Sequence, residues 1–278
     1  MKHTILGIGV ALLMVACQMA GYGGPTGVVR EGVPGKLDEV RAVASNDAEP
    51  LSSGEASGTR GETVGVSGLE LPATFRGDLP CADCEGIRYH LDLWPDGVFH
   101  LRRAWLGKPG IEDDRGRWRK DPSRPVIILN GGREMPLQFE VQGSRSIRKL
   151  DIEGQAIDSD LPVNLTGDGA LTPTDLSLGL QGMFTYMADA ARFEECLTGR
   201  SYPVAMESDY IKLERAYLEA DKPEPGVPLM VSFEGDITRK PAMEGDAMIP
   251  TVIVRRFIGV WPGQRCERAT SKAGLTDQ

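Results

Sequence analysis

Two cysteines three positions apart, Cys81 and Cys84, are the residues whose type and spacing most clearly permit chemistry. A disulfide between them would close a four-residue ring, which stabilises a fold by only roughly 2 kcal/mol in the chain-entropy model. Stability is therefore a weak reason for the pair. Two thiols this close suit reversible disulfide chemistry or, as thiolates, capture of a soft metal ion, for which Cu(I) is the natural candidate. One such pair supplies too few ligands for a structural zinc site.

The segment after the cysteine pair is expected to form a β-hairpin, with strands at 87–94 and 98–106. A three-residue loop with Gly97 at positive φ would place Trp94 opposite Val98. In that register the apolar residues of the second strand join the apolar face of the first, whereas a two-residue loop would put them on the polar face. A thioredoxin-like oxidoreductase would open a helix at its CxxC motif, so the hairpin disfavours thiol–disulfide catalysis.

The same register makes His90 and His100 diagonal neighbours on the other face of the hairpin, with Cα atoms roughly 7–8 Å apart. Their imidazoles could support a weak Cu(II) site. The favoured interpretation is a solvated polar face, on which Arg88, Asp92 and Arg102 exchange charge contacts.

An acidic run, Glu112, Asp113 and Asp114, is expected to be a solvated loop between two strands, because a calcium site would need further oxygen ligands. The formal net charge of −9, without a run of Lys and Arg, argues against a nucleic-acid partner. The sequence has neither a glycine-rich phosphate loop nor a Gly-x-Ser-x-Gly motif. Nothing assembles an acid, a base and a nucleophile, so the chain is expected not to be an enzyme and to require no cofactor.

The rest of the chain predicts an all-β protein in two units. Short apolar segments separated by Gly, Asp, Pro and Ser are typical of a sandwich or barrel. In the second unit three strands, one helix and two strands follow in the order of an OB-type five-stranded barrel. The expected strands of the first unit after the hairpin are 116–118, 125–129, 137–141, 147–152 and 161–165, and the elements of the second are 182–188, 192–196, 201–206, helix 210–220, 228–237 and 251–261.

The beginning of the chain predicts export and lipidation. Residues 1–16 combine a basic start with an apolar run too short to span a bilayer, which is typical of a signal peptide. The run ends before Cys17 in a sequence that resembles a lipobox, so Cys17 is the expected lipidated residue. Gln18 favours the outer membrane, with the body facing the periplasm or exposed at the surface. Residues 17–67 are rich in Gly, Ser, Ala and acidic residues and are expected to be a flexible tether.

Cys196 and Cys266 form a second pair and enclose about seventy residues of the second unit. In an oxidising periplasm a disulfide between them would persist. A loop that long is worth roughly 4 kcal/mol in the chain-entropy model, which favours a structural disulfide. A redox-reporting bond is the alternative interpretation.

The segment 77–87, GDLPCADCEGI, resembles the LPCADC-x-GI signature of the NlpE copper-resistance lipoproteins. Segment 150–157 resembles the LD-x-x-G-x-x-I sequence that closes the same domain. Residues 182–190, 193–199 and 210–217 resemble the OB-like C-terminal domain of the longer members. The resemblance implies a lipocalin-like β-barrel followed by an OB-type domain. The expected organisation is a signal peptide at 1–16, a tether at 17–67, the barrel domain at 68–175, the OB-like domain at 176–268 and a tail at 269–278.

The resemblance also implies a role. The family reports copper excess, adhesion or failed lipoprotein trafficking to a Cpx-type sensor histidine kinase, and contributes to copper tolerance. Cys81 and Cys84 would carry over as its metal or redox pair, with copper as the candidate metal, and Cys196–Cys266 as its C-terminal disulfide. The membrane, through the lipid anchor, and the lipoprotein-trafficking and disulfide machinery are further implied partners. The alternative function is a periplasmic lipocalin-like carrier of an apolar ligand, in which the CxxC disulfide is structural.

Overall fold

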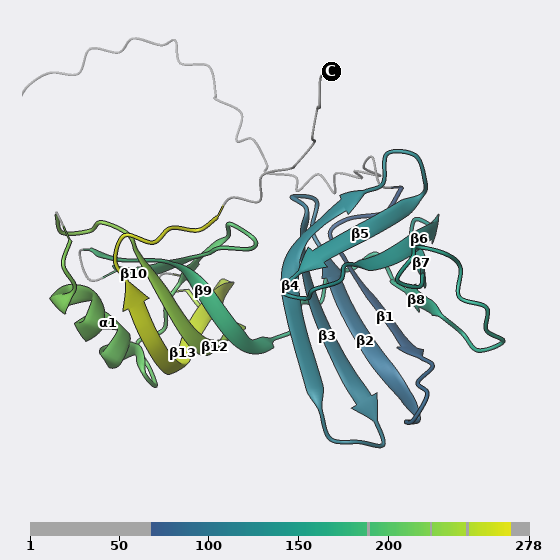
Figure 1. Ribbon diagram of the computed structural model, residues 1–278, viewed down its shortest axis with the longest axis horizontal. Helices are drawn as coiled ribbons and strands as arrows, with labels where there is room; N and C mark the ends of the chain where they lie inside the picture. The colour runs from purple at the N-terminus through teal and green to yellow at the C-terminus, as the bar shows by residue number, and fades with distance from the viewer. Residues whose placement is uncertain (1–67, 188–189, 223, 243–244, 268–278) are drawn as a thin grey trace, which may run out of the picture. The chain divides into compact units, whose positions relative to one another are not determined.

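The structure, a computed structural model, describes residues 68–187, 190–222, 224–242 and 245–267 (Figure 1). The expected signal peptide, Cys17, the tether up to residue 67 and the tail at 269–278 lie outside these residues. Within the described part of the chain, no helix is both long and apolar enough to cross a membrane.

The first domain is a closed barrel of eight antiparallel strands, in which each strand pairs with the next (Figure 1). The last strand returns to the first, where Thr166 stands opposite Arg76. Alternate side chains point inward, and Phe75, Leu91 and Phe139 are among those that fill the core. The strands are β1 (Ala73–Leu79), β2 (Gly86–Leu93), β3 (Val98–Leu106), β4 (Ile111–Lys120), β5 (Val126–Gly131), β6 (Leu137–Gly143), β7 (Ser146–Lys149) and β8 (Asn164–Thr166).

The expected hairpin register is confirmed. Leu93 pairs with Phe99, and the backbone N–H of Trp94 donates to the Val98 carbonyl at 3.0 Å. Gly97 has φ of 80°, as the three-residue loop requires. The apolar residues of β2 and β3 therefore face the barrel interior together.

Strand β1 was not predicted, because Gly77 interrupts its apolar alternation. A Cβ at this position would lie 2.6 Å from the Asn164 carbonyl oxygen, so the close approach of β8 requires a glycine. Ala73, Phe75 and Leu79 still face the core.

The interpretation of the acidic run as a solvated loop is wrong, because all three carboxylates lie in β4. Asp113 stands opposite Arg102, and Glu112 stands opposite Arg103. The Arg102 guanidinium donates to Asp113 at 2.7 Å, and that of Arg103 donates to Glu112 at 2.5 Å. Cross-strand charge pairing of this kind makes an acidic sequence compatible with a strand.

The second domain is a five-stranded sheet in the order β11-β10-β9-β12-β13. A parallel bridge between Val204 and Val252 links the region after β11 to β13, which gives the OB-type arrangement that was expected. The helix packs through Tyr210, Leu213 and Tyr217 into the core of this domain. The elements are β9 (Leu176–Met187), β10 (Ala190–Glu195), β11 (Ser201–Pro203), α1 (Tyr210–Glu219), β12 (Leu229–Pro241) and β13 (Met248–Trp261).

Candidate functional site

The cysteine pair lies in the loop between β1 and β2, at one end of the barrel. Cys81 and Cys84 form a disulfide with Cα atoms 5.3 Å apart. Both residues are half-buried, and Asp83 between them is exposed. Gly86 follows with φ of 153°, a backbone conformation that favours glycine and lets the chain enter β2 directly after the loop. The barrel therefore presents the disulfide at its surface.

A cavity of ≈ 460 Å³ opens beside this loop, lined by the loop and by the turn after β3. The register that pairs Gly86 with Leu106 brings Lys108 to the loop, where its Nζ lies 2.7 Å from an Asp83 carboxylate oxygen. The Lys108 hydrogen bond, followed by its charge, lowers the pKa of Asp83. The sequence pattern did not single out Asp83 or Lys108, although the hairpin register already placed the turn next to the loop.

The loop has the donor atoms for a soft metal ion. The Sγ atoms of Cys81 and Cys84 and a carboxylate oxygen of Asp83 all lie within 4.8 Å of one another. In the disulfide form the sulfurs are not thiolates, so metal binding requires reduction. The reduced pair supplies two thiolates, the ligand type that Cu(I) prefers, and Asp83 supplies a third, harder ligand atom. The residues present thus fit a copper ion in the reduced state.

His90 and His100 lie on the outer face of the same hairpin but belong to a different environment. The His90 Nε2 lies 2.9 Å from the Thr172 carbonyl oxygen and 3.2 Å from Asp92. His100 is only 4% exposed, and its ring packs edge-on against Trp94 with centroids 4.7 Å apart. Within the described residues, neither imidazole joins the cysteine group.

The expectation of a solvated polar face around these histidines is wrong. Asp92 is fully buried and accepts hydrogen bonds from the Thr74 hydroxyl at 2.5 Å and the Thr174 backbone N–H at 2.8 Å. Arg88 pairs with Asp78 and not with Asp92. The segment at 172–174 brings these partners from about eighty residues away in sequence, which local alternation does not reveal.

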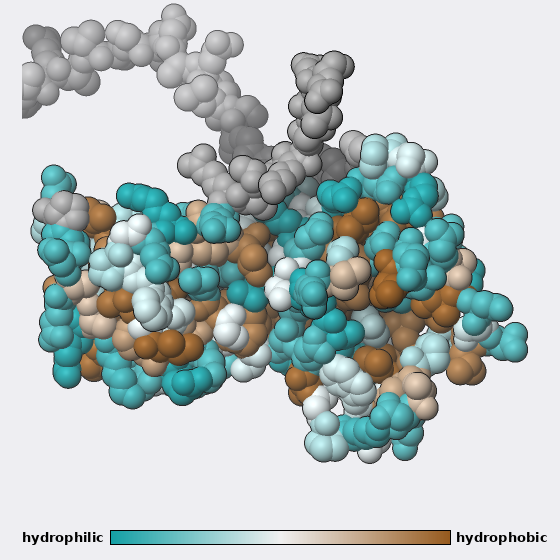
Figure 2. All heavy atoms as spheres, viewed as in Figure 1, coloured by the Kyte–Doolittle hydropathy of each residue, from teal (hydrophilic) through white to brown (hydrophobic). Residues whose placement is uncertain are grey.

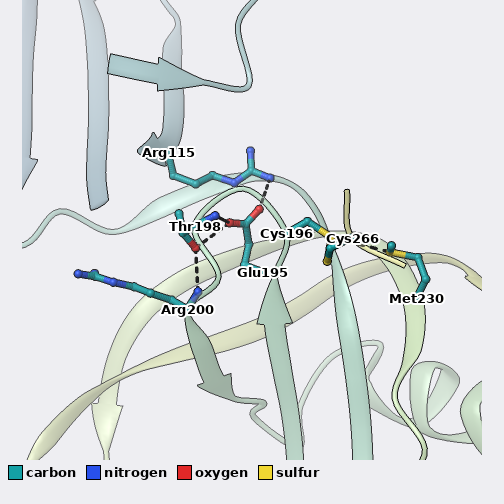
Figure 3. The surroundings of a disulfide bond; sticks show 7 residues. All are labelled: Arg115, Glu195, Cys196, Thr198, Arg200, Met230 and Cys266. Atoms are coloured by element: carbon teal, nitrogen blue, oxygen red, sulfur yellow. Dashed lines mark hydrogen bonds and ion pairs between the residues drawn. A yellow bond between two sulfur atoms is a disulfide. The ribbon is translucent and has the colours of Figure 1, made fainter. Parts of the chain in front are cut away.

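The second cysteine pair, Cys196 and Cys266, is also a disulfide and ties the end of β10 to the chain after β13 (Figure 3). The Met230 Sδ lies 3.9 Å from the Cys196 Sγ. The preceding residue, Glu195, is 1% exposed and accepts hydrogen bonds from the backbone N–H and the hydroxyl of Thr198, both at 2.8 Å. Arg115 of β4 completes the shell with an ion pair to Glu195 at 3.0 Å. Both of its cysteines are half-buried, as Cys81 and Cys84 are, and the two pairs differ in the length of chain that they close.

The chain belongs to the class of two-domain β-barrel proteins. Its first domain carries a disulfide loop at the surface, and its second, of OB type, is closed by a long-range disulfide. Residues 75–160 match the model of the NlpE N-terminal domain, and residues 175–267 match that of the NlpE C-terminal OB domain. The chain belongs to the NlpE family.

Individual proteins and solved structures are similar to this chain. The lipoprotein NlpE of Escherichia coli strain K12 is 34% identical over 204 residues, which are 70% of this chain and 81% of that protein. The crystal structure of the Cpx pathway activator NlpE from Escherichia coli is 30% identical, with a TM-score of 0.29, and covers 70% of this chain and 98% of its own. The crystal structure of a putative lipoprotein from Shewanella oneidensis is 31% identical in sequence, with a TM-score of 0.32. The match covers 37% of this chain and 93% of that protein's chain.

Proposed function

We propose that this chain is an outer-membrane lipoprotein that contributes to copper homeostasis and signals envelope stress or surface adhesion to a Cpx-type sensor kinase. Its relative in Escherichia coli is named a lipoprotein and a Cpx pathway activator. In this proposal residues 1–16 are the signal peptide, Cys17 carries the lipid, and the folded domains face the periplasm or the cell surface. Contacts with the kinase, and with lipoprotein-trafficking and disulfide-forming proteins, carry the signal. No catalytic step is part of the role.

The observation that carries the proposal is the open cysteine loop. A four-residue disulfide ring contributes little to stability, yet here it is partly exposed beside a ≈ 460 Å³ cavity. Asp83 and Lys108 add a carboxylate and an ammonium at its edge. Accessible thiols with charged neighbours are typical of reactive or metal-binding pairs, and buried thiols are typical of structural ones.

The chemistry at the loop is a redox-gated metal site. A dithiol reductant of the periplasm would transfer two electrons and two protons to the Cys81–Cys84 disulfide and leave two thiols. The Asp83 carboxylate lies 3.4 Å from the Cys81 Sγ and is itself paired with Lys108 at 2.7 Å. The two thiolates, with Asp83 alongside, would then hold Cu(I), and the thiol protons pass to solvent. Oxidation would return the disulfide and abolish the site.

The test is a deletion strain complemented with the wild-type chain, with Cys81→Ser/Cys84→Ser, or with Cys196→Ser/Cys266→Ser. Growth in copper and a Cpx-responsive reporter are measured, with the amount of each protein in the membrane fraction as a control. We expect the Cys81→Ser/Cys84→Ser variant to accumulate normally but to fail to restore the copper response. If deletion itself changes neither copper tolerance nor the reporter, the proposed function is wrong.

A further inference from the structure

The end of the barrel that carries the cysteine loop also contains charged side chains that point into the lumen. Arg103 on β3 is inward, like Leu101 two residues earlier, and its side chain is 13% exposed. Its guanidinium carbon lies 5.5 Å from the centre of the Trp105 ring and 5.8 Å from that of Tyr89. One guanidinium nitrogen donates to Glu112, but the buried Nε has no hydrogen-bond partner among the described residues.

A second guanidinium reaches the same place from the loop after β5. Arg133 forms ion pairs with Glu112 and, at 3.1 Å, with Asp114. Asp114 also accepts the backbone N–H of Gly132 at 2.8 Å. Glu112 and Asp114 of β4 are therefore already paired with Arg103 and Arg133.

Lys149, at the end of β7, adds a third positive charge. Its Nζ donates to the Leu150 carbonyl and lies 5.7 Å from the centre of the Phe139 ring. Among the residues that the structure describes, no carboxylate forms an ion pair with it. Burial lowers the pKa of Lys149, and the charges of Arg103 and Arg133 lower it further, against an opposing effect of Asp151. The three cations are therefore close together, and Lys149 is half-buried without an ion pair to any described residue, which leaves an ammonium that an entering anion could contact directly.

Apolar side chains surround this end of the barrel. Four large hydrophobic residues of the barrel are exposed among the described residues, and all four lie on loops or strand starts at this end. Half-buried Trp105 and Leu137 continue the apolar surface inward. Figure 2 shows hydrophobic residues interspersed with hydrophilic ones on the visible surface of the barrel. The exposed residues are Ile111, Met135, Ile152 and Leu161.

We propose that this open end binds a single-chain anionic lipid, with its carboxylate or phosphate head at Arg103, Arg133 and Lys149 and its chain against the apolar rim. The clustered cations, with Lys149 free of an ion pair and the Arg103 Nε without a partner among the described residues, select an anion. The rim selects an alkyl chain, so the two observations together define an amphiphile. Arginine and lysine both bind carboxylate and phosphate oxygens with charge-assisted hydrogen bonds. The proposal does not rest on the copper function, because neither cysteine is a ligand of the lipid.

The test uses the mature chain, residues 17–278, with Cys17→Ala so that no lipid is attached. A dansylated undecanoic acid reports binding by fluorescence, and oleate, oleoyl lysophosphatidic acid and oleyl alcohol compete with it below their micelle concentrations. We expect oleate and the lysophosphatidic acid to displace the probe at least tenfold more effectively than the neutral alcohol. Lys149→Gln should weaken probe binding about tenfold, and Lys149→Arg should restore most of it.

Lys222→Gln is the matched control, because Lys222 is also half-buried, donates to backbone carbonyls and lies 4.8 Å from an aromatic ring, but in the second domain. It should bind the probe like the wild type. The proposal is overturned if a folded chain shows no saturable probe binding or if oleyl alcohol displaces the probe as well as oleate does. It is also overturned if Lys149→Gln and Lys222→Gln weaken probe binding equally. Displacement by acetate or inorganic phosphate at the concentration of oleate would also overturn it, because a free anion would then suffice.

Discussion

At the scale of single residues, two polar side chains on the outer face of the β2–β3 hairpin, Asp92 and His100, are buried. His100 alternates with core residues on β3, yet it is almost fully buried and its Nε2 has no hydrogen-bond partner among the described residues. Burial lowers the pKa of His100 to about 4, against the opposing charge of Asp92. The imidazole is therefore neutral in the folded protein at neutral pH.

A pH dependence of stability follows from this residue. The pKa of an unfolded histidine is about 6.5, so the unfolded chain takes up a proton first as the pH falls. The contribution of neutral His100 to the free energy of unfolding is therefore complete above about pH 6.5. It is lost progressively as the pH falls toward about 4, the pKa of His100 in the folded protein. Urea unfolding from pH 7.5 to 4.5 should show the wild type losing up to ~3 kcal/mol relative to His100→Gln. Parallel stability curves for the two proteins would contradict this account.

At this scale the sequence indicates the cysteine pair and the hairpin histidines but not the residues that contact them. The sulfur chemistry predicted from the spacing of Cys81 and Cys84 stays a prediction. The hairpin register that makes His90 and His100 diagonal neighbours is confirmed. It did not predict the burial of Asp92, because the covering contact comes from Thr174, 82 positions later in the chain. Contacts this distant leave no periodic signal in one sequence.

At the scale of elements, apolar alternation predicted most strands, and it failed where another requirement overrode it. In β1 a glycine is needed for the approach of β8, and in β4 the acidic residues are neutralised by arginines on neighbouring segments. The OB-type order of the second domain was predictable because its helix and strands each carry a clear pattern. A close backbone approach, by contrast, is visible only in three dimensions.

Strand β9 allows this effect of close approach to be measured within one element. A Cβ at Gly182 would lie 2.1 Å from the Glu194 carbonyl oxygen and 2.6 Å from the Phe193 ring. At Gly179, on the same strand, a Cβ would meet nothing within 4 Å. Gly182→Ala should therefore destabilise the second domain by about 1–3 kcal/mol, and Gly179→Ala by less than ~0.5 kcal/mol. Equal thermal midpoints for the two variants would show that β9 and β10 adjust freely.

At the scale of the whole molecule, the two disulfides differ in the length of chain that they close. Cys196–Cys266 closes a loop with a sequence separation of 70, whereas Cys81–Cys84 has a separation of 3. The chain-entropy model assigns roughly 4 kcal/mol to the first and roughly 2 kcal/mol to the second. In our proposal the long-range bond is thus a stabilising element, and the short one serves metal or redox chemistry.

Urea unfolding of the oxidised protein should reflect this division. We expect Cys196→Ser/Cys266→Ser to lower the unfolding free energy of the second domain by up to ~4 kcal/mol, and Cys81→Ser/Cys84→Ser to lower that of the barrel by no more than ~2 kcal/mol. A larger loss from the short pair would mean that the cysteine loop is mainly a structural clamp.

A Cu(I) competition titration of the reduced mature chain shows whether the Cys81–Cys84 loop captures the metal. Cys81→Ser/Cys84→Ser is compared with Cys196→Ser/Cys266→Ser, which removes the same number of thiols from the other domain. The account predicts tight binding of one Cu(I) per chain that survives loss of the second pair and disappears with loss of the first. An absence of binding, or binding unchanged by Cys81→Ser/Cys84→Ser, would contradict it.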